Sequence, residues 1–366
     1  MKTLHIIEPT LNNTAGHCFT VVHALAMAAR EGLSDHHVHV WTGHHFDAHT
    51  MHESGANIHR YFYRRIRRLQ LWWLLRDLLT KGDGVLLPTA GRSELAIYSF
   101  LSRKLRQKGD AWFYFHQLRM DGAREARLRL LTQRIPEANI LCTHPALQRI
   151  VRDSGFNHAL LQPCPFAPPL HPFKIASFQH IIFPGEARLD KNFPFLLTLV
   201  RYMHEQQMTI PIMIQAGPNH HGHYSVAIAE LIQSLRNIGY AYLNMPQQAF
   251  SSGDYLDQFT GGLCLQPYRS EDYAAKISGI TLDALTRGCP CIAATNTWPA
   301  DVLNEFGAGK VCEALDVQIW MQAIMQVIDD YPRYQQQCRQ AMDVLSIRHH
   351  PMRTLETITG YGSRYT

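Results

Sequence analysis

Residues 273–294, YAAKISGITLDALTRGCPCIAA, decide the fold that we predict. They indicate a loop, a short helix, a turn and a buried strand. Ser278 is a favourable N-cap, because its hydroxyl can accept a hydrogen bond from the first turn of the helix. Gly288 can adopt the left-handed conformation that ends a helix, and Pro290 prevents its continuation. Cys291–Ala294 then reads as a short core strand.

The start of this helix carries chemistry. Ser278 and Gly279 leave the first backbone N–H groups uncovered, and a helix N-terminus attracts anions. Lys276 adds a positive charge, and Asp283 lies about one turn further on. A diphosphate at the helix start with a carboxylate on a sugar hydroxyl would hold a nucleotide-sugar. The alternative is an ordinary capped helix of an α/β domain.

The stretch resembles the donor-binding segment of GT-B glycosyltransferases, especially family 4-type retaining enzymes that build bacterial surface polysaccharides. The resemblance implies an α/β fold of two Rossmann-like domains facing each other across a cleft. It implies donor-binding roles for Ser278, Gly279, Ile280 and Asp283, and a catalytic role for Lys276. Many members carry a glutamate eight residues before the helix acid, where this chain has Ala275.

The length of 366 residues predicts two domains of ordinary size. Gln162–Pro172 contains five prolines and reads as the linker between them. We therefore expect an acceptor domain at 1–165 and a nucleotide-sugar-binding domain at 173–351. The resemblance implies that the tail, 352–366, packs back on the first domain.

The first domain opens with a strand at Leu4–Ile7, a polar loop and an amphipathic helix that starts at His17. This order is typical of a Rossmann-like domain, but the loop has no GxGxxG, which disfavours a bound dinucleotide. The Gly16-His17 pair resembles one found in related polysaccharide enzymes, where the loop approaches donor and acceptor. The alternative is a plain turn followed by a histidine at the helix start.

His116 directly follows a predicted strand, Trp112–Phe115. Ligands of open α/β sheets bind at the carboxyl ends of strands, so this position favours a binding role. In the family resemblance, this histidine lines the donor-sugar site and acts in catalysis. The alternative is a buried structural histidine.

The second domain opens with the strand His180–Phe183, followed by a loop that holds Arg188 and Lys191. Both side chains can point at a diphosphate. The segment resembles the Gly-Arg-x-x-x-x-Lys element of these transferases, although here the arginine spacing differs. The resemblance gives Lys191 a catalytic role and Arg188 a donor-binding role. The alternative is a charged surface loop.

Positive charge is concentrated in the first half, where residues 1–165 hold 21 Lys and Arg against 13 Asp and Glu. This excess suggests an anionic partner, such as membrane lipid or a phosphorylated lipid carrier. We predict a helix from Tyr63 to Leu75, with the arginines of Arg64–Arg68 on one arc and Ile66, Leu69 and Trp73 opposite. Arginines beside tryptophans suit an anionic membrane surface. The alternative is a domain helix with a solvated basic face.

The remaining composition excludes several classes of protein. The eight cysteines show no zinc or disulfide spacing, which predicts reduced thiols in a cytoplasmic protein. The 22 histidines show no spaced ligand pair, so we expect no metal. We see neither a signal peptide nor an apolar run of transmembrane length. No feature indicates nucleic acid as a partner.

The predicted function is transfer of a sugar from a UDP- or GDP-linked donor to a saccharide or lipid-linked acceptor, in synthesis of exopolysaccharide, capsule or lipopolysaccharide. The nucleotide-sugar is a substrate, and no cofactor is expected. Retention of anomeric configuration is implied by the resemblance alone. The alternatives are a GT-B nucleotide-sugar 2-epimerase, which needs no acceptor, and an inactive partner in a polysaccharide assembly complex. Ala275 favours the latter.

Overall fold

The computed structural model describes residues 2–14, 16–118, 122–167, 175–218, 223–247, 250 and 252–360. The chain forms two compact units: Met1–Ala167 with Ser346–Thr366, and Pro168–Leu345. The end of the predicted linker, from Pro168 to Pro172, and residues 361–366 of the predicted tail lie outside the described residues.

The first unit alternates strands and helices. Its strands are β1 (Lys2–Ile7), β2 (His36–Gly43), β3 (Asn57–Phe62), β4 (Gly84–Ala90), β5 (Ala111–Phe115), β6 (Asn139–Cys142) and β7 (His158–Leu161). Its helices are α1 (His17–Gly32), the 3-10 helix η1 (Ala48–Ser54), α2 (Arg67–Lys81), α3 (Arg92–Ser99), α4 (Arg103–Arg106), α5 (Gly122–Arg134), α6 (Pro145–Asp153) and α15 (Pro351–Thr359).

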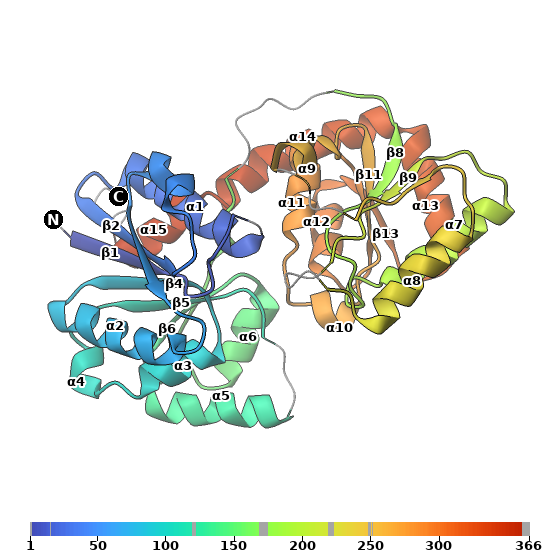
Figure 1. The fold of residues 1–366 in the computed structure, drawn as a ribbon. Helices are drawn as coiled ribbons and strands as arrows, with labels where there is room; N and C mark the ends of the chain where they lie inside the picture. The colour runs from blue at the N-terminus through green and yellow to red at the C-terminus, as the bar shows by residue number, and fades with distance from the viewer. Residues whose placement is uncertain are drawn as a thin grey trace. The chain divides into compact units, whose positions relative to one another are not determined.

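The seven strands form one parallel sheet in the order β3-β2-β1-β4-β5-β6-β7. The strand order reverses between β1 and β4, which makes their carboxyl ends the switch point where open α/β sheets bind ligands. Helices α1 and α15 lie on one face of this sheet, and α2 and α3 lie on the other (Figure 1). The sheet is therefore covered on both faces, as parallel sheets require.

The second unit repeats this plan. Its strands are β8 (His180–Phe183), β9 (Ile212–Ile214), β10 (Leu243–Asn244), β11 (Gly262–Gln266), β12 (Cys291–Ala294) and β13 (Gly309–Cys312). Its helices are α7 (Phe193–Glu205), α8 (Val226–Asn237), α9 (Ser252–Asp257), α10 (Ser270–Tyr273), α11 (Gly279–Thr286), α12 (Trp298–Phe306), α13 (Val317–Asp329) and α14 (Tyr331–Arg348), whose last residues belong to the first unit. The strands are parallel in the order β10-β9-β8-β11-β12-β13, so the switch point lies between β8 and β11.

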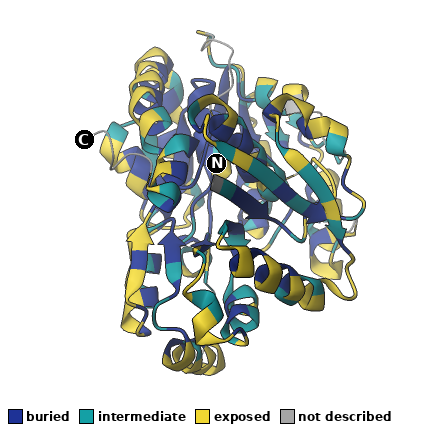
Figure 2. Cartoon of the chain, turned by 90° about the vertical axis from the view of Figure 1, so that its left-hand side faces the viewer, coloured by how far each residue is buried: buried dark blue, intermediate teal, exposed yellow. Residues whose placement is uncertain are grey.

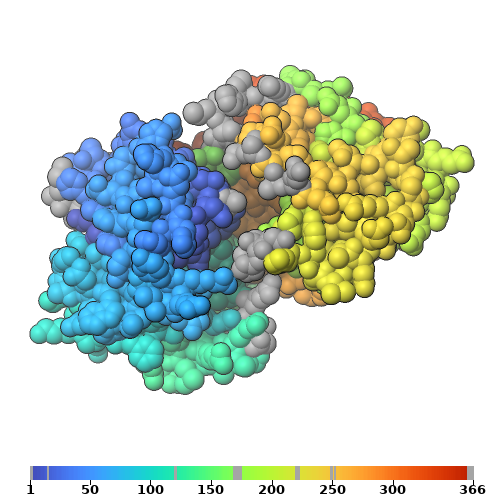
Figure 3. Space-filling model, viewed as in Figure 1, coloured from blue at the N-terminus to red at the C-terminus, as the bar shows by residue number. Residues whose placement is uncertain are grey.

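Buried apolar side chains explain why these segments are strands. Every residue of β11 and of β12 is buried, which is typical of central strands with helices on both faces. Figure 2 shows the same pattern in the first unit, where the buried residues gather on the strands and on the sides of helices that face them. In the space-filling view of Figure 3, the blue residues of the first unit, which include α2, lie at the surface that faces the viewer.

The last helix of the chain, α15, belongs to the first unit. Helix α15 packs against α1, and the sulfur of Met352 lies close to Gly32 of α1. The carbonyl of Cys164 also contacts the Nδ1 atom of His349, at 2.9 Å. None of the helices in the described part of the chain is long and apolar enough to cross a membrane.

Candidate functional site

Two loops meet at the switch point of the second sheet. One follows β8 and carries Arg188, Asp190 and Lys191, and the other follows β11 and carries Lys276 before α11 begins at Gly279. Because β8 and β11 are parallel neighbours, their carboxyl ends bring these loops to one edge. The sequence-predicted residues of the two motifs are therefore brought together.

Asp190 is the centre of this group. The Arg188 guanidinium binds its carboxylate with two nitrogens, Nε at 2.8 Å from Oδ1 and Nη2 on Oδ2. The Lys276 ammonium lies 3.5 Å from the same Oδ2. Although burial opposes the charge, Arg188, Lys276 and Lys191 together hold the pKa of Asp190 below its usual range. We call Arg188, Asp190, Lys191 and Lys276 the cationic cluster.

Lys191 is the buried member of the cationic cluster, with 7% of its surface exposed. Its Nζ lies 3.4 Å from the carbonyl oxygen of Pro184. Burial, followed by the charge of Arg188, lowers the pKa of Lys191 to about 8. A buried ammonium is costly unless an anion compensates it. The site therefore favours a further negative charge beside Lys191.

Gly185 explains how Lys191 reaches this position. Its φ is +92°, and a Cβ there would lie 2.8 Å from the Lys191 Nζ and 3.5 Å from Cδ1 of Ile280. Only glycine fits such a conformation without strain and leaves room for the ammonium. The contact distances also bring Ile280, in the first turn of α11, next to Lys191.

The start of α11 is open. A Cβ added to Gly279 would meet no atom within 4 Å, and the residue is exposed. Ser278 occupies the N-cap position, but its side chain makes no capping hydrogen bond, so the predicted hydroxyl cap is wrong. The hydroxyl instead interacts with the phenol of Tyr268, and Ser278 is buried.

The ammonium of Lys276 lies over an aromatic ring. Its Nζ lies 4.4 Å from the centre of the Tyr273 ring, and the Tyr273 ring contacts that of Tyr268 at a tilt of 33°, with ring centres 4.3 Å apart. A cation over a tyrosine face is attracted by the ring quadrupole. The side chain of Lys276 is thus held between Tyr273 and Asp190.

Asp283 lies one turn into α11 and is half-buried. The Tyr255 hydroxyl of α9 donates to its Oδ2 at 3.1 Å. Burial raises the pKa of Asp283 to about 7, against the opposing effect of that hydrogen bond. This carboxyl group can therefore accept or donate a hydrogen bond near neutral pH.

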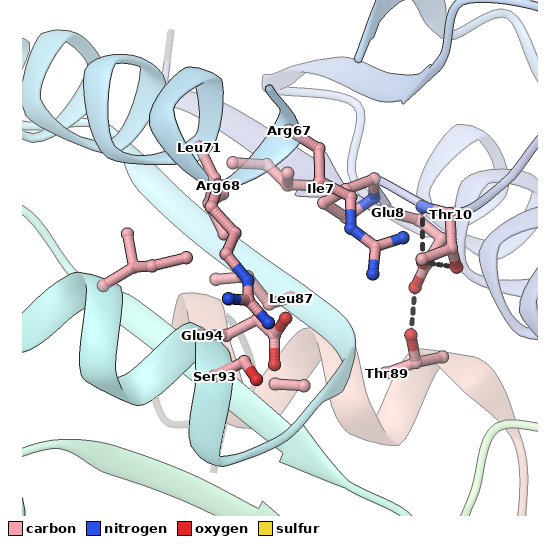
Figure 4. Close-up of a pocket in the computed structure, with 13 residues that line it drawn as sticks. Ile7, Glu8, Thr10, Arg67, Arg68, Leu71, Leu87, Thr89, Ser93 and Glu94 are labelled. Atoms are coloured by element: carbon pink, nitrogen blue, oxygen red, sulfur yellow. Dashed lines mark hydrogen bonds between the residues drawn. The ribbon is translucent and has the colours of Figure 1, made fainter. Parts of the chain in front are cut away.

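A pocket opens at the switch point of the first sheet. It is an open space of about 520 Å³ between the ends of β1 and β4 and the first turns of α2 and α3. Glu8, Thr10, Thr89, Ser93 and Glu94 supply its polar walls, together with Arg67 and Arg68 (Figure 4). Its apolar lining residues are Ile7, Pro9, Leu71, Leu87, Ala90 and Ile97.

Glu8 is the buried acid of this pocket, with 1% of its surface exposed. Its carboxylate accepts hydrogen bonds from the hydroxyls of Thr10, at 2.5 Å, and Thr89, and from the Thr10 amide at 3.1 Å. Burial raises the pKa of Glu8 despite these bonds. A carboxyl group in this setting is suited to binding a ligand hydroxyl or to holding its proton.

The arginine-rich segment differs from its prediction. Helix α2 begins only at Arg67, so Arg64 and Arg65 lie in the turn before it. Figure 4 shows Arg67 pointing toward Glu8 and Arg68 toward Glu94. The predicted single arc of four arginines is therefore wrong, because two of them line the pocket.

The apolar residues of this segment are exposed. Ile66, Leu69 and Trp73 are 51%, 57% and 51% exposed, while α2 packs on the unit through Leu71, Leu74, Leu75, Leu78 and Leu79. We call the exposed set Tyr63, Arg64, Arg65, Ile66, Leu69 and Trp73 the basic-aromatic patch.

The histidines predicted for the donor-sugar site lie together in the first unit. Gly16 has a φ of +86° and precedes α1, whose first residue is His17. The Nε2 atom of His17 lies 2.9 Å from Nδ1 of His116, which follows β5. The second ring nitrogen of His116 lies 2.6 Å from the Pro88 carbonyl oxygen. Burial, and then the nearby His17, lower the pKa of His116 well below its usual value.

Sequence reasoning missed Asp190 and Glu8. Asp190 stands between Arg188 and Lys191 in the sequence, so its ion pairs could have been anticipated. Glu8 directly follows β1, which was the same signal that singled out His116 after β5. Neither residue belongs to a motif, and this is why both were passed over.

No family model and no curated protein matches the sequence. Solved structures do match the fold. Anabaena HepE in complex with UDP-glucose matches with a TM-score of 0.73 at 12% identity, over 100% of both chains. Sucrose-phosphate synthase from Thermosynechococcus elongatus matches with a TM-score of 0.71 at 14% identity, over 98% of both.

A third match is the lipopolysaccharide outer core galactosyltransferase WaaB in its apo form. Its TM-score is 0.64 at 14% identity, over 99% of this chain and 100% of that chain. The fold of this protein is thus that of GT-B glycosyltransferases, two units each built on a parallel sheet, and the predicted fold class is confirmed.

Proposed function

We propose that this protein is a glycosyltransferase that uses a nucleotide-sugar donor. The observation that carries the proposal is the cationic cluster beside the open start of α11. Arg188, Lys191 and Lys276 converge on the single carboxylate of Asp190. A diphosphate would compensate the buried charge of Lys191 and meet the backbone N–H groups at Gly279 and Ile280.

The same groups suit the reaction as well as binding. When the glycosidic bond to the diphosphate breaks, negative charge grows on the departing phosphate oxygen. Lys191 and Lys276 are fixed in place before that charge develops, so they stabilise it without reorganisation. Asp283, with a pKa raised to about 7, is proposed to hold a donor hydroxyl. Arg188 and Ser278 are proposed to position the donor.

UDP is the nucleotide best supported. The HepE structures contain UDP, UDP-glucose, or UDP with glucose. A matching structure from E. coli, 11% identical to this chain, contains UDP-2-fluoro glucose. We keep GDP-linked donors as the second choice, as the sequence alone left both open.

We assign the acceptor to the pocket of the first unit. Its buried Glu8 can bind an acceptor hydroxyl, and Arg67 can bind an anionic group on the same molecule. A phosphorylated or acidic saccharide, or a lipid-linked one, carries both kinds of group. We assign the acceptor to the first domain and the donor to the second, as the sequence predicted, but with the bounds of the two units, Met1–Ala167 with Ser346–Thr366 and Pro168–Leu345.

His116 and its neighbours Gly16 and His17 are proposed to line the donor-sugar site. His116→Ala should lower kcat far more than it lowers nucleotide affinity, because the other unit holds the nucleotide. Transfer assays and nucleotide titrations on this variant separate the two effects. If His116→Ala kept the parental kcat, His116 would be a structural histidine.

We further propose that the acceptor is bound to a membrane. The basic-aromatic patch places exposed arginines beside Tyr63, Ile66, Leu69 and Trp73, a combination typical of proteins that bind an anionic bilayer surface. WaaB, which matches the fold, is a lipopolysaccharide outer core galactosyltransferase. We infer that this chain acts in surface polysaccharide synthesis, with retention of configuration, on an acceptor held at the inner membrane.

The testing experiment incubates the protein with a panel of UDP- and GDP-sugars, with and without saccharide acceptors. A thermal shift should first identify the donor, because ligand at 100 times Kd adds about 2.7 kcal/mol of stability. Sugar transfer only in the presence of acceptor supports the proposal, and the anomeric signal of the product reports retention. Conversion of the donor alone would indicate an epimerase, and binding of no nucleotide-sugar would indicate an inactive partner.

A further inference from the structure

Three metal-binding side chains converge in the first unit. Nε2 of His17, Nδ1 of His116 and Sγ of Cys164 all lie within 4.8 Å of one another. The His17 and His116 nitrogens are 2.9 Å apart, and the thiol sulfur lies 3.6 Å from the same nitrogen of His116. Within the described residues this is the one such group of three.

The orientation of His116 follows from its other nitrogen. Nε2 lies 2.6 Å from the carbonyl oxygen of Pro88, so this nitrogen carries the proton and donates it. Nδ1 then presents a single lone pair, on which both His17 and Cys164 converge. A histidine that ligates a metal usually donates its second N–H to a carbonyl in this way, which fixes the ring.

Cys164 is held in place by its backbone. Its carbonyl oxygen contacts Nδ1 of His349 at 2.9 Å, and the Tyr114 hydroxyl bonds to the carbonyls of Gln162 and Pro163 at 2.8 and 2.6 Å. Only 3% of Cys164 is exposed. The fold therefore anchors the backbone at Cys164, and from there the sulfur reaches Nδ1 of His116 at 3.6 Å.

Two of the three distances are close to those of a tetrahedral zinc site. Tetrahedral zinc, with bonds of about 2.1 Å to nitrogen and about 2.3 Å to sulfur, separates two nitrogen ligands by about 3.4 Å and a nitrogen and a sulfur by about 3.6 Å. The 3.6 Å separation of Nδ1 and Sγ already matches, and the two nitrogens must part by a few tenths of an ångström. We propose that His17, His116 and Cys164 bind one Zn²⁺ ion.

This site has an open fourth position. His17 is exposed, so solvent or a small ligand reaches the metal from its side. Three protein ligands with one open position are the arrangement of zinc sites that bind a water or a substrate atom. Binding requires Cys164 to release its thiol proton to solvent as the sulfur–zinc bond forms. Zinc would also occupy the His116 nitrogen, so metal binding and the sugar contact proposed for His116 would exclude each other.

The test uses the full chain, reduced and freed of metal, and titrates it with Co²⁺ as a coloured substitute for Zn²⁺. We expect one ion per chain and a thiolate-to-cobalt absorption band in the near ultraviolet, which Zn²⁺ then displaces. Cys164→Ser should abolish the band. His17→Ala should weaken binding at least about 10- to 100-fold, because a lost ligand costs no less than a lost outer partner.

Matched controls separate this site from general metal binding. Cys312→Ser removes another buried thiol, and His49→Ala removes another exposed histidine, so both should bind Co²⁺ like the parent. Because binding is read by absorbance, the result does not depend on transferase activity. Absence of the band in the folded parent would overturn the proposal. So would an unchanged band in folded Cys164→Ser, or parental affinity in His17→Ala.

Discussion

The two units place charged groups at the same point of the same kind of sheet, yet the charge balance differs. In the second unit, Arg188, Lys191 and Lys276 surround Asp190, and the buried Lys191 has its pKa lowered to about 8. In the first unit, two exposed arginines face Glu8 and Glu94, and the buried group is the acid. A buried lysine requires an anion, whereas a buried carboxyl group requires a hydroxyl or a proton donor.

This difference explains how one topology can serve two ligands. Both switch points collect loops from neighbouring parallel strands, so the fold fixes where a ligand binds but not which one. The second unit is suited to a diphosphate, and the first to a molecule rich in hydroxyl groups.

The largest effect is expected from Gly279→Val. A Cβ there meets no atom of the protein within 4 Å, so we expect the variant to fold like the parent. The branched side chain would fill the space in front of the α11 start, and nucleoside diphosphate affinity should fall about 100-fold, equivalent to about 2.7 kcal/mol. Calorimetric titration checks this. Gly122→Val is the matched control, since it adds a side chain into open space at the start of α5.

Lys191→Met should lower UDP affinity at pH 7 by about 1.5–3 kcal/mol, the usual contribution of a hydrogen bond to a charged group. The folded pKa of Lys191, about 8, lies below its ordinary value, so folding disfavours its protonated form. The free energy of unfolding at pH 7 should therefore stay at or above that of the parent. Lys310→Met, on β13, is the control for removal of a charge. A destabilised variant would contradict the burial argument.

The pH dependence of binding should follow the same lysine. Diphosphate binds the protonated ammonium, so binding raises the pKa of Lys191. Parental UDP affinity should be limited by this lysine only slightly at pH 7 and should fall as the pH rises through about 8 and beyond. Calorimetric titrations with UDP between pH 7 and 9.5 measure this fall, since that range spans the lowered pKa of Lys191. In Lys191→Met the fall should be absent. An identical fall in both proteins would assign it to another group.

Arg67→Gln should act on the acceptor alone. We expect about a tenfold rise in acceptor KM, about 1.4 kcal/mol, with unchanged UDP affinity. Steady-state assays with donor and acceptor varied separately check this. Arg149→Gln, an exposed arginine of α6, is the control. If UDP affinity fell instead, the two switch points would not divide the ligands as proposed.

The smallest effect is expected at the basic-aromatic patch. Arg65→Gln should weaken binding to anionic vesicles by about 1 kcal/mol, the usual value for one basic residue at a charged bilayer. Sedimentation with vesicles measures it, and transfer to a soluble acceptor should not change. Equal sedimentation of Arg65→Gln and the parent with vesicles would contradict a membrane-binding role for the basic-aromatic patch.

The fold could be predicted because its signals are local. Continuous apolar runs such as Cys291–Ala294 indicate buried parallel strands, and Gly288 with Pro290 marks the end of a helix. Two edge-side strands were not predicted. β7, HALL, is too short and leucine-rich to be distinguished from a helix, and β13, GKVC, has only its last residue buried.

The site was less accessible to sequence reasoning. The loop motifs around Lys191 and Lys276 were visible, but their convergence on Asp190 is a property of the tertiary structure. The predicted Ser278 cap failed because the hydroxyl is used by Tyr268, a partner ten residues earlier that capping rules do not consider. Arg67 and Arg68 were placed on one arc with Arg64 and Arg65 because the start of α2 could not be located to the residue.

The most direct test of the central claim is calorimetric titration of UDP into the parent and into Lys276→Ala. Lys276 touches Asp190 and Tyr273 but is not buried like Lys191, so its loss leaves the fold intact. We expect measurable UDP binding by the parent and a loss of about 1.5–3 kcal/mol of binding free energy in Lys276→Ala. The control Lys310→Ala should bind UDP like the parent. Equal affinity in parent and Lys276→Ala would place the nucleotide elsewhere and contradict the proposed donor site.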